Sequence, residues 1–202
     1  IVKMKKTKES TIYQDIVLAS SSPTRQKYIK KFIPNCEICH HKVKEQEIKR
    51  KQLSPRICAS LLAKEKALSI KNLFPKHKII GSDQILVCRD KIFSKPRNEE
   101  QAIRNLMLLQ NNVHILVSAV SVICGDKILY ETVKKAKLFF RSTTESEIKK
   151  YIQENKTAVF SSVGSYRIED NKKYNLVEIL SGDNETIIGF PIKNLLEKFK
   201  NE

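Results

Sequence analysis

The sequence predicts an α/β fold in which a mixed, curved sheet with flanking helices forms two lobes around a deep groove. Segments with strand-like and helix-like patterns alternate along one chain. A long hairpin is expected in the middle, where the apolar run Val113 to Cys124 is followed by a turn at Gly125 and Asp126 and by a second extended run. Such a hairpin favours a curved sheet with a groove between two lobes.

Composition indicates one domain. The chain has 202 residues, of which 41% are hydrophobic and 30% charged, with only five glycines and six prolines. We expect a single domain over residues 15–200, preceded by an N-terminal extension over residues 1–14. The extension is basic, but no apolar run of signal-peptide length follows it, and no stretch of about 18 consecutive apolar residues occurs. The expectation is a soluble, cytoplasmic protein without a membrane partner.

The first expected elements are a strand, a polar loop and a helix. The apolar run Ile16 to Ala19 predicts the strand, and a helix is expected to begin near Thr24. In this arrangement the first N–H groups of the helix could hold phosphate together with Ser20, Ser22 and Arg25. Simple N-capping by Ser22, with a proline in the first helical turn, explains the local pattern equally well.

Helix-start signals divide the rest of the chain. Ser54 and the proline after it predict a second helix that runs to about Asn72, and Asn98 predicts a third, with two glutamates in its first turn. Thr144 and Glu147 form a capping-box pattern that starts another helix. A strand is expected in "NLVEIL" and a last helix after "IIGFP".

Asp83 interrupts an apolar run, because "GSDQ" stands between two isoleucines and the segment "ILV". An ionised carboxylate in a core costs several kcal/mol unless it is paired or metal-bound. Either this strand opens into a cleft, or Asp83 starts a turn.

The five cysteines are an odd set without a secretory signal, which favours reduced thiols over a disulfide framework. Two of them stand in "CEICHH", with His40 and His41, a pattern typical of c-type haem attachment or of half a zinc site. No second cysteine pair of this kind follows, so the motif is a weak alternative.

The net charge of +16 raises the alternative of a nucleic-acid-binding protein. Only eight of the 38 basic residues are arginine, and the lysines are scattered through every segment. A compositional bias toward lysine explains this as well as polyanion binding does. No aromatic-rich basic platform or GXXG loop is present, so specific nucleic-acid binding is not expected.

Seven segments together resemble the Maf family of nucleoside triphosphate pyrophosphatases. In order they are "LASSSPTRQ", "KEQE", "LAKEKA", "GSDQ", "SKPRNEEQA", "GSYRIE" and "IIGFPI". The resemblance covers about residues 15–199. It implies a Maf/ITPase-like α/β fold, usually dimeric, that uses a divalent cation, Mg²⁺ or Mn²⁺, to cleave a nucleoside triphosphate between the α and β phosphates.

The resemblance also implies roles for individual residues. Arg25 matches the phosphate-binding arginine of the family, Lys66 and Lys95 match its two phosphate-facing lysines, and Ser20 and Ser22 supply hydroxyls nearby. Glu45 and Asp83 match its two acidic residues, which hold the metal or, for Asp83, deprotonate the attacking water. In this interpretation Asp83 interrupts an apolar strand because the strand lines a catalytic groove.

Some positions depart from the usual family pattern. Thr24 stands where an arginine is common, and Ser161 and Ser162 replace an acidic and a basic residue. The "GSDQ" segment and Glu169 resemble the branch that acts on 7-methyl-GTP, which makes Gln84 and Glu169 candidates for base recognition. A nucleotide-binding protein that has lost catalysis is the main alternative, and retention of both acidic residues favours an active enzyme.

Overall fold

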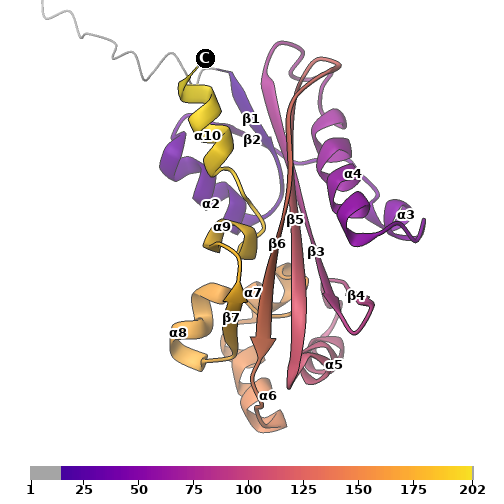
Figure 1. The fold of residues 1–202 in the computed structure, drawn as a ribbon, viewed down its shortest axis with the longest axis vertical. Helices are drawn as coiled ribbons and strands as arrows, with labels where there is room; N and C mark the ends of the chain where they lie inside the picture. Colours follow the sequence, from indigo (N-terminus) through magenta and orange to yellow (C-terminus); the bar gives the residue numbers. More distant parts are fainter. Residues whose placement is uncertain (1–14, 202) are drawn as a thin grey trace, which may run out of the picture.

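A seven-stranded mixed sheet forms the centre of the protein, with helices on both of its faces (Figure 1). The computed structural model describes residues 15–201, so the expected extension over residues 1–14 lies outside the described part. The strand order is β2-β1-β3-β5-β6-β7, and β4 pairs with β3. The strands are β1 Ile16–Ala19, β2 Glu37–Cys39, β3 Lys78–Cys88, β4 Lys91–Phe93, β5 Asn112–Cys124, β6 Lys127–Phe140 and β7 Val177–Ser181.

The helices divide between the two faces of the sheet. Figure 1 shows α3 and α4 on one side of β3 and β5, and α2, α9 and α10 on the other. The helices are α2 Pro23–Phe32, α3 Glu45–Lys49, α4 Pro55–Leu68, α5 Glu99–Leu109, α6 Glu145–Glu154, α7 Lys156–Ser161, α8 Asn171–Tyr174, α9 Asn184–Ile187 and α10 Lys193–Lys200, with a 3₁₀ turn, η1, at Ile168–Asp170. Within residues 15–201 no helix is long and apolar enough to cross a membrane.

The helix starts predicted from capping signals are confirmed. Ser22, Ser54 and Asn98 each accept a hydrogen bond from a backbone N–H in the first turn of α2, α4 and α5. Thr144 and Glu147 form the complete capping box of α6. Helix ends were harder to predict, and α4 stops at Leu68 rather than at Asn72, because turns follow at once. Six short elements were not predicted, since none of them contains enough residues to show a period: β2, α3, α7, η1, α8 and α9.

The hydrophobic core of the described residues is divided into four clusters. In one cluster, α5 and α6 pack against the beginning of β5 and the end of β6, and its largest side chains include Phe140 and Tyr151. Another packs α2 and α10 against β1 and β3 around Phe190 and Phe199. A third, smaller cluster lies beneath α4.

One edge of β3 is uncovered in its middle. Residues 78–81 of β3 pair in parallel with β1, and residues 86–88 pair with β4. Between them, no strand of the described chain pairs with residues 82–85 on this edge, whereas β5 follows the other edge from Ile79 to Val87. Asp83 therefore lies within a continuous strand, and the alternative that it starts a turn is wrong.

Candidate active site

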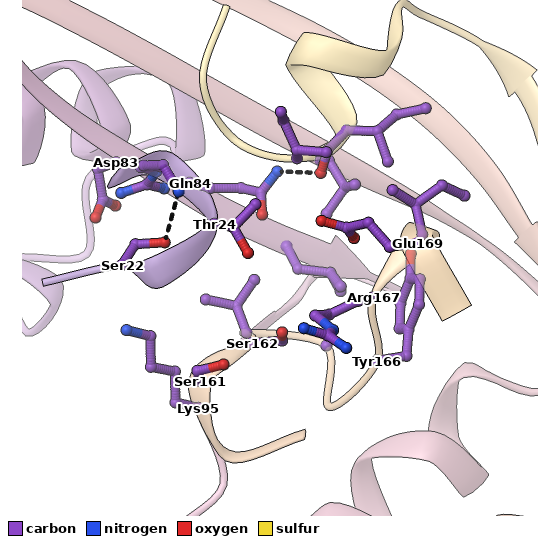
Figure 2. Close-up of a pocket in the computed structure, with 18 of the residues that line it drawn as sticks. Ser22, Thr24, Asp83, Gln84, Lys95, Ser161, Ser162, Tyr166, Arg167 and Glu169 are labelled. Carbon is purple, nitrogen blue, oxygen red and sulfur yellow. Dashed lines mark hydrogen bonds between the residues drawn. The ribbon is translucent and has the colours of Figure 1, made fainter. Parts of the chain in front are cut away.

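A cleft opens at the uncovered edge of β3, between the loop that enters α2, helix α3 and the segment from Ser161 to Glu169 (Figure 2). Both signs of charge line it. The ionisable side chains among its lining residues are those of Arg25, Glu45, Lys49, Lys66, Asp83, Lys95, Tyr166, Arg167 and Glu169. The cleft thus brings together every site residue expected from the sequence except Ser20.

Close packing of α4 on β3 places Lys66 beside Asp83. A Cβ on Gly81 would lie 2.0 Å from the carbonyl oxygen of Ala63, so only glycine allows α4 to approach this closely. Asp83 is two residues further along the strand and therefore faces the same helix. Lys66 lies one turn beyond Ala63, and both its side chain and that of Asp83 are almost fully buried.

Lys66 joins the two carboxylates. Its Nζ lies 2.6 Å from Oδ1 of Asp83 and 2.8 Å from Oε1 of Glu45. One buried and one half-buried anion with a cation between them are tolerated because each charge has a partner. The other oxygen of Asp83, Oδ2, is buried and accepts no hydrogen bond from the described residues. This oxygen is available to a water molecule or a cation.

Helix α3 delivers Glu45 to the cluster. Burial alone would raise the pKa of Glu45, but Lys66 and Lys49 outweigh burial and lower the pKa to about 2. Lys49 lies one turn further along α3, with its Nζ 3.2 Å from Oε2 of Glu45. Glu45 is therefore ionised at neutral pH, and its helix holds it in the cleft.

His41 links the "CEICHH" segment to this cluster. Its Nε2 lies 3.6 Å from Oε1 of Glu45, and its Nδ1 accepts the N–H of Val43. Burial and the nearby Lys66 lower the pKa of His41, so the ring is neutral at pH 7. All five cysteines are free thiols, and no group of three or more His, Cys, Asp or Glu residues in the described chain could hold a metal. The structure gives the haem or zinc alternative no support.

Arg25 is held by two backbone carbonyls. Its Nε donates to Gly189 at 3.0 Å and its Nη1 donates to Ser82 at 2.9 Å. Gly189 has a φ of +84°, and a Cβ there would lie 2.9 Å from Nη2 of Arg25, which explains the glycine in "IIGFP". The guanidinium keeps its Nη2 donors, so Arg25 can bind an anion while it also connects β3 to the segment after α9.

The serines of the first loop have different environments. Ser22 lines the cleft, and its Oγ accepts the N–H of Arg25. This is the N-cap expected as the simple alternative. Ser20 is buried and does not line the cleft, and its Oγ accepts the N–H of Ser22. Its hydroxyl supports the loop from behind.

Gln84 follows Asp83 in β3, so its side chain projects from the face of the strand opposite to that of Asp83. Its amide nitrogen donates to the carbonyls of Thr186 and Ile187 and to the hydroxyl of Ser118. These contacts hold α9 against the sheet and leave Oε1 of Gln84 as an acceptor at the cleft. Figure 2 shows Glu169, Arg167 and Tyr166 on the opposite side of the cleft from Asp83 and Lys95.

The wall that carries Glu169 is anchored in the core. Tyr166 makes a 2.6 Å hydrogen bond with Nε2 of the fully buried His114. Arg167 forms an ion pair with Asp170 at 3.0 Å. Ser161 and Ser162 both donate to the carbonyl of Ala158, so their hydroxyls close α7. Glu169 is exposed, and the structure gives it no ion pair or hydrogen bond within residues 15–201.

Two cations of the cleft were not predicted as site residues. Lys49 stood in a charged run that a solvated loop also contains, although its spacing of four residues from Glu45 is that of an ion pair on one helical face. Arg167 stood in "GSYRIE" but matched no expected role. Lys95, which was predicted, lines the cleft with no ion-pair partner in the described chain, and burial lowers its pKa.

The fold and the site define a class of protein: an α/β protein whose cleft combines paired carboxylates with several cations, as binding and cleavage of a phosphorylated ligand require. The chain belongs to the family described as Maf-like protein, whose profile matches residues 15–202. This membership confirms the family resemblance found in the motifs.

Sequence alignments with related proteins cover most of the chain. It is 38% identical over 149 residues to a nucleoside triphosphate pyrophosphatase of Bradyrhizobium diazoefficiens, a match that covers 74% of this chain and 73% of the relative. It is 32% identical over 189 residues to a 7-methyl-GTP pyrophosphatase of Rhizobium etli, covering 92% and 94%. The solved structure of the Staphylococcus aureus Ham1 protein matches 60% of this chain and 68% of that chain, with a TM-score of 0.35 and 18% identity.

Proposed function

We propose that this protein is a nucleoside triphosphate pyrophosphatase, which hydrolyses a nucleoside triphosphate to a monophosphate and pyrophosphate. One observation carries the proposal: Lys66 holds Asp83 and Glu45 together in a cleft that also contains Lys95 and Arg25. Membership of the Maf family and the names of the relatives support it.

In the proposed reaction the nucleophile is a water molecule and the leaving group is pyrophosphate. The oxygen of a water molecule attacks the α-phosphorus, and the bond from this phosphorus to the oxygen that bridges to the β-phosphate breaks. The bridging oxygen leaves with pyrophosphate, and a proton of the water passes to Oδ2 of Asp83, the buried oxygen that accepts no hydrogen bond from the described residues. Lys95 and Arg25 stabilise the charge that accumulates on the phosphates.

A divalent cation fits the carboxylates. Carboxylate oxygens are ligands that Mg²⁺ and Mn²⁺ prefer, and the carboxylates of Glu45 and Asp83 would supply them, while Oδ2 of Asp83 remains the proton acceptor. The described residues offer no third acidic ligand, so phosphate oxygens of the nucleotide would complete the coordination. When bound, the cation neutralises phosphate charge and polarises the reacting phosphoryl group.

Product analysis tests the proposal. The protein is incubated with a panel of canonical and modified nucleoside triphosphates and with Mg²⁺ or Mn²⁺, and pyrophosphate and monophosphate are measured. Orthophosphate and a nucleoside diphosphate as the products would contradict the proposal, because cleavage would then be at the wrong phosphate. Tight nucleotide binding without turnover would support the alternative of a binding protein that has lost catalysis.

The preferred base is proposed to be guanine, in the form of 7-methyl-GTP. Oε1 of Gln84 and the carboxylate of Glu169 are acceptors at the cleft, and the N1 and N2 groups of guanine are donors. The 7-methyl-GTP pyrophosphatase of Rhizobium etli is one of the relatives, which supports this choice. A comparison of kcat/KM for 7-methyl-GTP, GTP, UTP and dTTP tests it.

The protein is also proposed to act as a homodimer, as the family resemblance implies. Sedimentation equilibrium on the purified protein measures the mass in solution. A mass of one chain at all concentrations would contradict this part of the proposal and would leave the reaction unaffected.

A further inference from the structure

We propose that Lys49 is a substrate-binding residue that contacts the pyrophosphate end of the nucleotide. The inference rests on the proposed function, since it concerns the phosphates of a nucleoside triphosphate in the same cleft. Neither the family motifs nor the ion pair of Lys49 with Glu45 would by itself suggest this binding role.

The position of Lys49 is that of a site residue and not of a surface lysine. It lines the cleft, and its side chain is only 14% exposed. Helix α3 places it one turn after Glu45, with Nζ 3.2 Å from Oε2 of that residue. An ammonium group has three donors, and Glu45 is the one partner that the structure shows for it in the described chain. Donors therefore remain for a ligand.

Most other cations of the cleft are already engaged. Lys66 is shared by two carboxylates. Arg25 gives two of its nitrogens to backbone carbonyls. Arg167 contacts Asp170 through Nε and Nη2. Among the described residues that line the cleft, only Lys95 and Lys49 keep an ammonium with most of its donors free. A triphosphate carries more negative charge than one lysine can neutralise.

The place of Lys49 along the cleft indicates which phosphates it reaches. Glu45, Lys66 and Asp83 form one end of the cleft, and Lys49 belongs to this end through Glu45. Glu169 and Arg167 form the opposite side (Figure 2). A nucleotide with its base near Glu169 therefore extends its phosphates toward Lys49. The β and γ phosphates, which leave as pyrophosphate, lie furthest from the base.

Lys49→Gln tests the inference, with Lys44→Gln as the matched control. Lys44 precedes the same helix and forms an ion pair of the same kind with Glu47, but its side chain is 81% exposed and it does not line the cleft. The affinity of each variant for inorganic pyrophosphate is measured by calorimetry, and kcat and KM are measured with the best substrate of the panel. Lys49→Arg shows whether charge alone restores binding.

Lys49→Gln should weaken pyrophosphate binding about tenfold or more, the worth of one hydrogen bond to a charged group, and should raise KM. Lys44→Gln should match the wild type, and Lys49→Arg should recover most of the affinity. Unchanged pyrophosphate affinity with a lowered kcat would overturn the inference, because Lys49 would then act only by holding Glu45. If the wild type hydrolyses no nucleotide, the proposed function fails, but the pyrophosphate measurement still decides the role of Lys49.

Discussion

Gly81 and Ala63 touch, and their contact sets the geometry of the site. A Cβ on Gly81 would lie 2.0 Å from the carbonyl oxygen of Ala63 and 2.9 Å from the backbone nitrogen of Ala67. Both obstacles are backbone atoms of α4, which cannot move aside as a side chain can. The distance between α4 and β3 therefore depends on the absence of a side chain at Gly81, and with it the position of Lys66 beside Asp83.

Gly81→Ala should displace α4 and separate Lys66 from Asp83. Overpacking of this kind costs about 1–3 kcal/mol, so we expect a lower free energy of unfolding and a loss of turnover in the molecules that remain folded. Gly125→Ala is the control, because its Cβ would meet no atom closer than 3.9 Å. Because φ is +58° at this position, Gly125→Ala should lower the free energy of unfolding by about 1 kcal/mol without an effect on turnover. Normal activity of folded Gly81→Ala would show that the contact is unimportant for the site.

Asp83→Asn should remove catalysis and leave the fold intact. The amide keeps the shape but cannot take a proton from water, so turnover should fall by roughly 10²–10⁴. Lys66 remains paired with Glu45 at 2.8 Å, so the stability loss should be well below the 3–5 kcal/mol of an unpaired buried charge. Turnover and thermal unfolding are measured on one sample. Near-normal turnover with a much lower Tm would assign Asp83 a structural role instead.

Removal of the metal should stop the reaction, and the metal alone should bind weakly. Ammonium groups of Lys66 and Lys49 already contact both oxygens of Glu45 and one of Asp83. We expect activity to disappear with EDTA and to return with Mg²⁺ or Mn²⁺. Mn²⁺ binding, followed by electron paramagnetic resonance, should tighten about tenfold or more when a non-hydrolysable nucleotide is present. Tight Mn²⁺ binding without nucleotide would contradict this account.

The sequence predicted the elements whose signals are local. Ser22, Ser54, Asn98 and Thr144 marked helix starts correctly, because a cap is satisfied within a single turn. The five-residue helix α3 escaped prediction, since its stability comes from packing and from the contacts of Glu45 rather than from a repeating pattern.

The site was predicted through family motifs and not through geometry. Asp83 was noticed as a carboxylate in an apolar strand, but its pairing with Lys66 depends on how closely α4 packs, which no local pattern states. The same holds for Arg25, whose carbonyl partners are at Ser82 and Gly189, 57 and 164 residues further along the chain. Lys49 was not predicted as a site residue, because the sequence of a charged run is the same whether the run lies on an exposed surface or lines a cleft.

Acid should destabilise the protein through His114. Burial lowers the pKa of this histidine to about 4, below its ordinary value of 6.5. The unfolded chain therefore binds a proton more readily between pH 6.5 and pH 4, and stability falls as the pH falls through this window, by about 3 kcal/mol in all. His41, whose pKa is also lowered, acts in the same direction.

The free energy of unfolding, measured in urea at several pH values, checks this contribution. The pH dependence should be reduced in His114→Gln, and His40→Gln is the control because His40 is exposed. An equal slope for the wild type and His114→Gln between pH 4 and pH 6.5 would show that His114 does not titrate as a buried group.

Glu169→Gln should change the choice of base rather than the chemistry. Glu169 lines the cleft on the side opposite Asp83 and makes no ion pair or hydrogen bond in the described part of the chain, so its carboxylate oxygens can accept donors from a base (Figure 2). The amide replaces one acceptor with a donor, which would face the N1 and N2 donors of guanine. We expect kcat/KM for 7-methyl-GTP and GTP to fall by roughly 10- to 100-fold, with a much smaller change for UTP. The control is Glu178→Gln, because Glu178 lies on β7 and forms an exposed ion pair with Arg141. This variant should leave kcat/KM unchanged for the guanine nucleotides and for UTP. A similar fall for every nucleotide would instead indicate that Glu169 acts through the charge of the cleft, and base recognition would then have to come from Gln84.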